Sequence, residues 1–275
     1  MIKAIKRLFA PKPLVLGNGK HVKPPMPIAP FVIFALVIVG YISVKVTGFS
    51  FATIVKRGKE FFVILKAMFP PDWGYIGHVM EPLLDTIKMS FLGSFAGAAL
   101  AVPFAVLSSS NIAKSKVLYH ITRFLLSLVR TLPTLIIALI ATYVFNIGTL
   151  AGTLAIGIFT FAIVAKMLYE QIETVDMAAF EAMESLGASK VQAFMTAVVP
   201  QILPSYLSIC LYSLEINVRY AAILGYVGAG GIGLLLDEKL KLRGYDKASM
   251  VIVMLFVTVV CIESISRYLR KRLTQ

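Results

Sequence analysis

Charged residues are scarce in this sequence. Only 15% of its 275 residues are Asp, Glu, Lys or Arg, against about 25% in typical globular domains. Hydrophobic residues make up 58%, and the mean hydropathy is +0.84. Disorder requires low hydrophobicity, so this composition excludes a disordered chain and argues against an ordinary soluble enzyme. It favours a protein with several membrane-spanning helices.

Residues that hold metals or form disulfides are also few. The two cysteines, Cys210 and Cys261, lie inside apolar runs, where a small buried side chain is the expected role. The three histidines are far apart, without the H-E-x-x-H spacing of a zinc site. No segment matches the ATP-binding pattern G-x-x-x-x-G-K-[ST]. We therefore expect no metal site, no disulfide framework and no ATPase site, and we do not expect this chain to be an enzyme.

Six apolar runs have about the length that a spanning helix requires. They cover residues 28–46, 86–107, 124–145, 147–168, 205–226 and 249–266. A transmembrane helix needs roughly 20 apolar residues, so the sequence predicts an all-α membrane protein with six spans. We divide it into residues 1–80, which hold a basic N-terminus, the first span and an external interfacial segment, and residues 81–275, a transmembrane domain.

Basic residues between the spans give the orientation. The 27 Lys and Arg residues divide into 16 on the side of the two termini and 11 on the opposite side. Because cytoplasmic loops carry an excess of Lys and Arg, we expect both termini in the cytoplasm. The positive charge is spread between apolar runs and does not gather on a soluble face, so nucleic acid is not an expected partner.

A glycine-rich segment follows the fifth predicted span. Residues 228–233 match G-x-G-x-x-G, the pattern of a dinucleotide-binding turn. That turn needs a preceding strand and a following helix, whereas this segment follows a membrane span. Glycine permits positive φ and close approach of backbones, so we interpret the segment as a structural bend. Its glycines are Gly225, Gly228, Gly230, Gly231 and Gly233.

A long polar segment lies between the fourth and fifth predicted spans, at residues 170–204. Its apolar residues at helical spacing are Met177, Phe180, Met183 and Leu186. Gly187 is placed to end that helix, and Ser189 to Gln192 has the form of a capping box that starts a second one. We expect no span to cover this stripe, so it should dock in a groove on another protein. A helix resting on the membrane surface is the alternative.

The same segment resembles a known motif. Glu181-Ala182-Met183 is followed by Gly187 and then by Pro200, a pattern that resembles the EAA loop in membrane subunits of bacterial binding-protein-dependent ABC importers. That family has a second alanine at Met183, and Ile and Leu at Ala197 and Val199; these departures keep size and polarity. Three further segments resemble the phosphonate-type permeases in particular: Arg130-Thr-Leu-Pro133, Glu215-Ile-Asn217-Val-Arg219, and residues 225–233.

The resemblance implies a six-span permease with the type I ABC importer fold, working as a homodimer in the bacterial plasma (inner) membrane. It implies two copies of a separate ATPase, which hold ATP and Mg, docked on the 170–204 coupling loop, and an extracytoplasmic substrate-binding protein. The chain itself would bind no cofactor. The implied cargo is a phosphonate or a related phosphorus oxyanion such as phosphite or a phosphate ester. The residues expected to contact the ATPase are Phe180, Glu181, Ala182, Met183, Gly187 and Ala188.

Ionisable residues inside spans are costly and usually functional. The candidates for the substrate pathway are Arg130, Glu215, Asn217 and Arg219. Arg219 could meet an anion, but Glu215 lies four residues earlier on the same face and could pair with it. Arg130 could line the pathway or extend its side chain to the lipid headgroups. Both interpretations stay open for each arginine.

Two other functions also stay open. The glycine-rich end of the fifth span resembles permeases for methionine or another small organic solute as well. An ion-coupled secondary transporter is the alternative of a different class. Such a transporter would not need the 170–204 segment as a dock, and it should show inverted internal repeats, which this sequence lacks.

Overall fold

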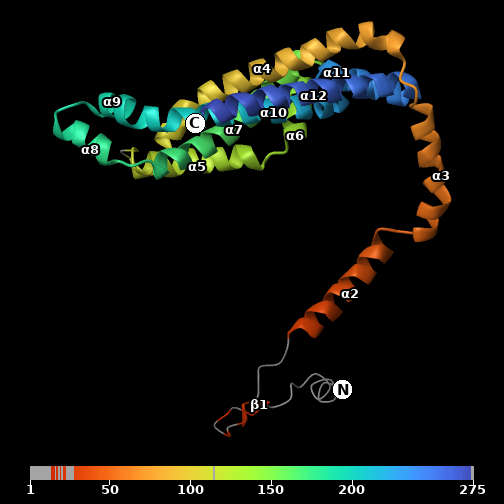
Figure 1. Cartoon of the computed structure of the whole chain (residues 1–275), viewed down its shortest axis with the longest axis horizontal. Coiled ribbons are helices and arrows are strands. Elements are labelled where there is room, and N and C mark those ends of the chain that lie inside the picture. The colour runs from red at the N-terminus through yellow and green to blue at the C-terminus, as the bar shows by residue number, and fades with distance from the viewer. Residues whose placement is uncertain are drawn as a thin grey trace. The chain divides into compact units, whose positions relative to one another are not determined.

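The computed structural model describes residues 14, 15, 17, 19, 21, 22, 28–113 and 115–273. The described chain is almost entirely helical, as predicted (Figure 1). It forms two compact units, residues 1–63 and 64–275. The basic N-terminal residues 1–13 lie outside the described residues.

The first unit contains the first predicted span. A short antiparallel pair, β1 (Leu14–Val15) and β2 (His21–Val22), precedes α2 (Ala29–Val46). No residue of α2 is buried, although the helix is apolar on all sides and long enough to cross a bilayer. A helix of this kind needs apolar surroundings. The next helix, α3 (Phe51–Ala67), mixes phenylalanine with lysine and buries no residue, as an interfacial helix does.

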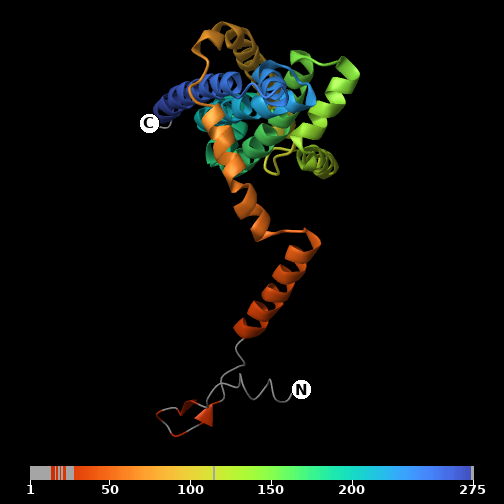
Figure 2. The same cartoon turned by 90° about the vertical axis from the view of Figure 1, so that its right-hand side faces the viewer.

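The second unit is a helical bundle. Its elements are η1 (Trp73–Tyr75), α4 (Ile76–Leu107), α5 (Lys116–Thr131), α6 (Thr134–Phe145), α7 (Thr149–Thr174), α8 (Ala178–Ser185), α9 (Lys190–Ala193), η2 (Phe194–Val198), α10 (Val199–Leu224), η3 (Gly225–Val227), α11 (Gly231–Lys241) and α12 (Tyr245–Leu273). The long helices α4, α7, α10 and α12 run side by side, with α8 and α9 at one end and α11 toward the other (Figures 1 and 2). Within the described residues, five helical segments are long and apolar enough to span a membrane.

The third predicted span, residues 124–145, is interrupted at Pro133 and is not one continuous helix. Helices α5 and α6 meet at an angle of 86°. Pro133 disfavours helical geometry at the residue before it, and Leu132 is extended with φ −76° and ψ 123°. Pro103, by contrast, lies inside α4 without ending it. The α5 and α6 pair is therefore a broken span or a re-entrant segment.

Small residues bring α4 close to α7. The stripe on α4 consists of Gly93, Gly97, Ala101 and Ala105. A Cβ added to Gly93 would stand 2.8 Å from the carbonyl oxygen of Thr153, and one added to Gly97 would overlap that of Gly157. Ala101 and Ala105 are fully buried. Stripes of this kind let transmembrane helices approach closely, and here the stripe packs α4 against α7.

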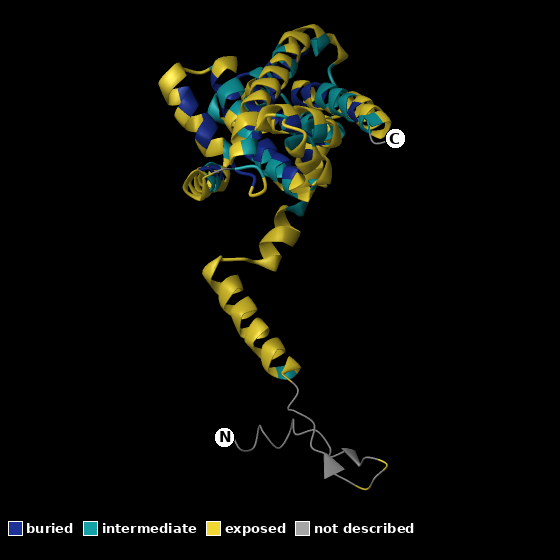
Figure 3. Cartoon of the chain, turned by 90° about the vertical axis from the view of Figure 1, so that its left-hand side faces the viewer, coloured by how far each residue is buried: buried dark blue, intermediate teal, exposed yellow. Residues whose placement is uncertain are grey.

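The outer surface of the bundle is apolar. Large side chains such as Phe91 (60% exposed), Phe95 (67%) and Phe256 (67%) face outward, while the buried residues lie inside the bundle (Figure 3). A soluble domain rarely exposes so much contiguous apolar surface. The same surface is stable in lipid, because the backbone groups of these helices are hydrogen-bonded within the helices themselves.

Candidate functional site

The segment between α7 and α10 contains one separate short helix, α8, and the start of a second helix, α9. The predicted second short helix is not separate, because α9 continues through η2 into α10 without a break. Helix α8 ends at Ser185, and Gly187 takes a φ of +89°, the left-handed geometry that glycine commonly adopts after a helix. The predicted capping box is present: the backbone N–H of Gln192 donates to Ser189 Oγ, and that of Ser189 donates to Gln192 Oε1. These bonds fix the direction in which α9 begins.

The apolar stripe of α8 packs against the chain itself, so the prediction that no span covers it is wrong. Phe180 is buried in a cluster with Leu168 and Ile172 of α7. The reason is that α7 continues to Thr174, past the predicted end of its span at residue 168, and reaches α8. Only the end of the stripe is free, since Leu186 is 84% exposed.

A partner protein could therefore reach a different face of this segment from the one the sequence suggests. Of the six residues predicted to contact an ATPase, Glu181, Ala182 and Gly187 are exposed. Met183 and Ala188 are half-buried, and Phe180 supports α8 from behind. The exposed face continues with Leu186, Val191 and Met195.

Polar contacts tie this segment to the bundle. Asn111 Nδ2, just after α4, donates to the carbonyl oxygen of Ile172 at 2.7 Å, and the backbone N–H of Ser110 donates to Glu173 Oε1 at 2.7 Å. Gln201 Nε2 of α10 donates to the carbonyl oxygen of Asp176 at 3.4 Å. These hydrogen bonds connect α4, α7 and α10 near the start of α8. We therefore expect a movement of α8 to displace these helices as well.

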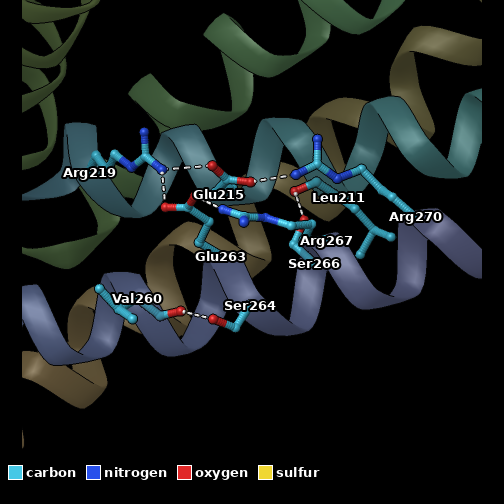
Figure 4. Close-up of polar contacts among 9 residues, drawn as sticks. All are labelled: Leu211, Glu215, Arg219, Val260, Glu263, Ser264, Ser266, Arg267 and Arg270. Atoms are coloured by element: carbon cyan, nitrogen blue, oxygen red, sulfur yellow. Dashed lines mark hydrogen bonds and ion pairs between the residues drawn. The ribbon is translucent and has the colours of Figure 1, made fainter.

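A charged cluster joins α10 to α12 (Figure 4). Buried Glu215 accepts a hydrogen bond from Arg219 at 2.7 Å through Oε1 and one from Arg270 at 2.8 Å through Oε2. Glu263 of α12 accepts from Arg219 at 2.9 Å and from Arg267. The sequence indicated only the pair on α10. A signal for the rest was available, because Glu263 is a carboxylate inside the last apolar run.

The cluster bears on the expected role of Arg219. Its guanidinium already contacts two carboxylates, and its side chain is 47% exposed. Glu215 is the better buried partner, with a side chain that is 8% exposed. Buried ion pairs are stable only when their geometry is good and the remaining atoms are also paired, and Glu215 meets both conditions. An anion contact by Arg219 stays a prediction.

Asn217 lies on another side of α10. It is completely buried, and its Nδ2 donates to Ser94 Oγ of α4 and to Thr160 Oγ1 of α7, each at 2.7 Å. Hydrogen bonds between transmembrane helices contribute about 0.6 to 2 kcal/mol each. The structure thus brings Glu215 and Arg219 together but places Asn217 apart from them, and Arg130 lies at the exposed end of α5. In the part of the chain that is described, no His, Cys, Asp and Glu cluster could hold a metal ion.

The glycine-rich segment packs backbone against backbone. A Cβ on Gly225 would overlap the backbone of Gly233, and one on Gly233 would overlap the carbonyl oxygen of Ala222. Three glycines between them have φ values of +69° to +81°: Gly228, Gly230 and Gly231. The N–H of Ile232 donates to Thr86 Oγ1 of α4 at 2.7 Å. Larger residues would not fit here, so the glycines fix the turn between α10 and α11.

Two sequence relatives match most of this chain. The phosphite transport system permease protein PtxC of Stutzerimonas stutzeri is 32% identical over 202 residues, which are 74% of each chain. The phosphate-import permease protein PhnE of Mycolicibacterium smegmatis is 32% identical over 211 residues, 76% of this chain. This chain spans only 40% of the length of the mycobacterial protein.

Solved structures share the fold. A chain from inward-facing structures of the MetNI methionine ABC transporter matches with a TM-score of 0.65 at 21% identity, covering 74% of this chain and all of that one. A chain of a bacterial alginate ABC transporter matches with a TM-score of 0.59 at 15% identity, covering 90% of this chain and 97% of that one. The family profile for the binding-protein-dependent transport system inner membrane component matches residues 101–275. The chain therefore belongs to this family of inner membrane transport components.

Proposed function

We propose that this chain is the permease subunit of an ABC importer for a phosphorus oxyanion such as phosphite, a phosphonate or a phosphate ester. The observation that carries the proposal is the 32% identity to a phosphite permease over three quarters of both chains. A second relative is named for phosphate. ATP hydrolysis on a separate subunit would drive transport, since the sequence has no P-loop of its own.

The exposed face of α8 is the proposed dock for that ATPase, with Glu181, Ala182 and Gly187 at its centre. Closure of an ATPase pair would move α8, and the Phe180 cluster would pass the movement to α7 and α10. The permease then alternates between two conformations whose balance the ATPase and a loaded binding protein each shift. We propose a homodimer, an extracytoplasmic binding protein as the third component, and both termini in the cytoplasm on the side of α8.

Uptake of radiolabelled phosphite tests the substrate class. The measurement uses cells that express this permease together with an ATPase and a binding protein from its own organism, and a strain without the permease as control. We expect an excess of unlabelled phosphite or methylphosphonate to reduce uptake, and methionine to have no effect. Uptake of labelled methionine in place of phosphite would contradict the proposal and support the methionine alternative.

Replacement of Gly187 tests the dock. A β-branched residue at positive φ costs about 1–3 kcal/mol of local strain, so Gly187→Val should shift the start of α9 and reduce the amount of ATPase that co-purifies with the permease. Ser185→Val, also exposed but outside the left-handed turn, is the matched control. Equal recovery of the ATPase with both variants would argue against docking on this segment.

A further inference from the structure

Helix α5 carries its basic residues along one face, next to the buried positions Thr122 and Leu126. Lys116, Arg123 and Arg130 are spaced seven residues apart and so lie on one face of the helix, with a drift of only about 20° per heptad. The opposite face is exposed and apolar: Val117, Leu118, Ile121, Phe124, Leu125 and Leu128. A soluble protein shows the reverse arrangement. The apolar face fits lipid, and the basic face fits a polar space within the protein.

Such a space lies between α5 and α7. A cavity of about 220 Å³ is lined by Arg123, Leu126, Ser127, Arg130, Lys166 and Tyr169. Three of these described lining residues are cationic and none is a carboxylate. One water molecule occupies about 30 Å³ of liquid, so the cavity has room for a small oxyanion and part of its hydration water.

Arg123 forms the fixed wall of this cavity. Its guanidinium lies between the rings of Tyr119 and Tyr169, 4.4 and 4.3 Å from their centroids. Its Nε donates to the carbonyl oxygen of Ser108 at 2.9 Å, and a terminal nitrogen contacts Glu173 at 2.6 Å. These partners hold the side chain in place and neutralise its charge. Arg123 therefore positions the site more than it attracts an anion.

The remaining two cations are available to a ligand. Lys166 contacts Glu170 at 3.3 Å, and both side chains are partly exposed, so the pair contributes little. Arg130 has no hydrogen-bond or ion-pair partner among the described residues. A guanidinium in this position matches an oxyanion, because its planar array of N–H donors can hold two oxygens at once.

We propose that this cavity is a binding station on the release route of the transported anion, with Arg130 and Lys166 as the groups that bind it. The proposal rests on the proposed import of a phosphorus oxyanion. Release requires binding that is weak enough to reverse, and two partly exposed cations, one of them shared with Glu170, provide that. Ion pairing of Arg123 with Glu173 also joins the cavity to the base of α8, where Ser110 donates to the same carboxylate.

A thiol placed in the cavity tests the proposal without transport. Ser127→Cys lines the cavity, and Leu128→Cys, on the lipid-facing side, is the matched control. Both are made with Cys210 and Cys261 replaced by alanine, and size-exclusion chromatography checks that each variant folds. Inside-out membrane vesicles are treated with an anionic or a cationic methanethiosulfonate. We expect the anionic reagent to modify Ser127→Cys about tenfold faster than the cationic one, since a basic cleft concentrates anions.

Two further measurements identify the ligand. Adding Arg130→Gln should remove most of the anionic preference, and millimolar phosphite or phosphate should slow modification of Ser127→Cys but not of Leu128→Cys. Equal rates with both reagents would overturn the proposal. Protection by anionic phospholipid but not by phosphite or phosphate would also overturn it, because the cavity would then be a lipid headgroup site. A third outcome separates the two proposals. If the anionic reagent reacts faster and phosphate protects Ser127→Cys, but cells do not import phosphite, the proposed substrate is wrong and the anion site is still supported.

Discussion

Two charged regions lie within the bundle, and they differ in how their charges are compensated. In the cluster between α10 and α12, Glu215 and Glu263 supply carboxylate partners to three arginines. In the cavity between α5 and α7, Arg123 has a carboxylate partner in Glu173, but Arg130 has none among the described residues.

This difference distinguishes charged residues that stabilise the fold from charged residues that can bind a ligand. An ionised group inside a membrane is costly, and a partner within the protein reduces that cost permanently. The cluster between α10 and α12 meets this condition and cross-links two helices. A cation that lacks such a partner can instead be compensated by a ligand that comes and goes, which is the role proposed for Arg130.

Removing the shared carboxylate of the cluster should have the largest effect. Glu215→Ala leaves Arg270 without this partner and Arg219 with Glu263 alone. Breaking a buried pair by removing one partner costs about 3–5 kcal/mol. We expect a marked fall in the thermal stability of the purified permease in detergent. An unchanged melting temperature would contradict the structural role of the cluster.

Removing both charges of the intrahelical pair should cost less. Glu215→Gln with Arg219→Gln leaves no uncompensated charge at these two positions, and the amide oxygen that replaces the carboxylate can still accept a hydrogen bond from Arg270. Neutral replacement of a buried pair is often close to neutral in stability, so we expect the double variant to melt well above Glu215→Ala. A double variant as unstable as Glu215→Ala would contradict this expectation and would show that Arg270 needs the negative charge of Glu215, not only a hydrogen-bond acceptor.

The smallest effect on stability is expected at the unpaired arginine. Arg130 lies at the exposed end of α5, and substitutions at such positions usually change the free energy of unfolding by less than about 0.5 kcal/mol. Arg130→Gln should therefore melt within error of the parent, as should Lys88→Gln, a control at a lysine that is 74% exposed. Strong destabilisation by Arg130→Gln alone would assign this residue to the fold.

The sequence predicted the parts of the structure that depend on local chemistry. The capping box at Ser189, the left-handed turn at Gly187 and the close packing through Gly93 and Gly97 all follow from the steric and hydrogen-bonding properties of those residues. The polar segment 170–204 lies between two helices long enough to span, as the hydropathy pattern predicts, and its role in coupling stays a prediction. The resemblance of this segment to the EAA loop predicted the family, and the family profile that matches residues 101–275 confirms it.

The parts that were missed depend on where helices end and what they meet. Helix α7 continues beyond its apolar run, and this extension buries Phe180, which a hydropathy pattern does not reveal. Pro133 was visible, but the angle of 86° after it depends on tertiary packing. Arg270, the partner of Glu215 on α12, is 55 residues away, a separation at which no local spacing rule applies.

The decisive measurement for the proposed anion contact at Arg130 is the initial rate of phosphite uptake. It is compared between Arg130→Gln and the double variant Glu215→Gln with Arg219→Gln. Both are measured at equal amounts of folded permease and with equal recovery of the ATPase. We expect Arg130→Gln to reduce uptake strongly and the double variant to keep most of it, because Arg130, which has no ion-pair partner among the described residues, is the arginine proposed to meet the anion. The opposite result, with uptake lost in the double variant and kept in Arg130→Gln, would place the anion pathway at Arg219 and contradict the account.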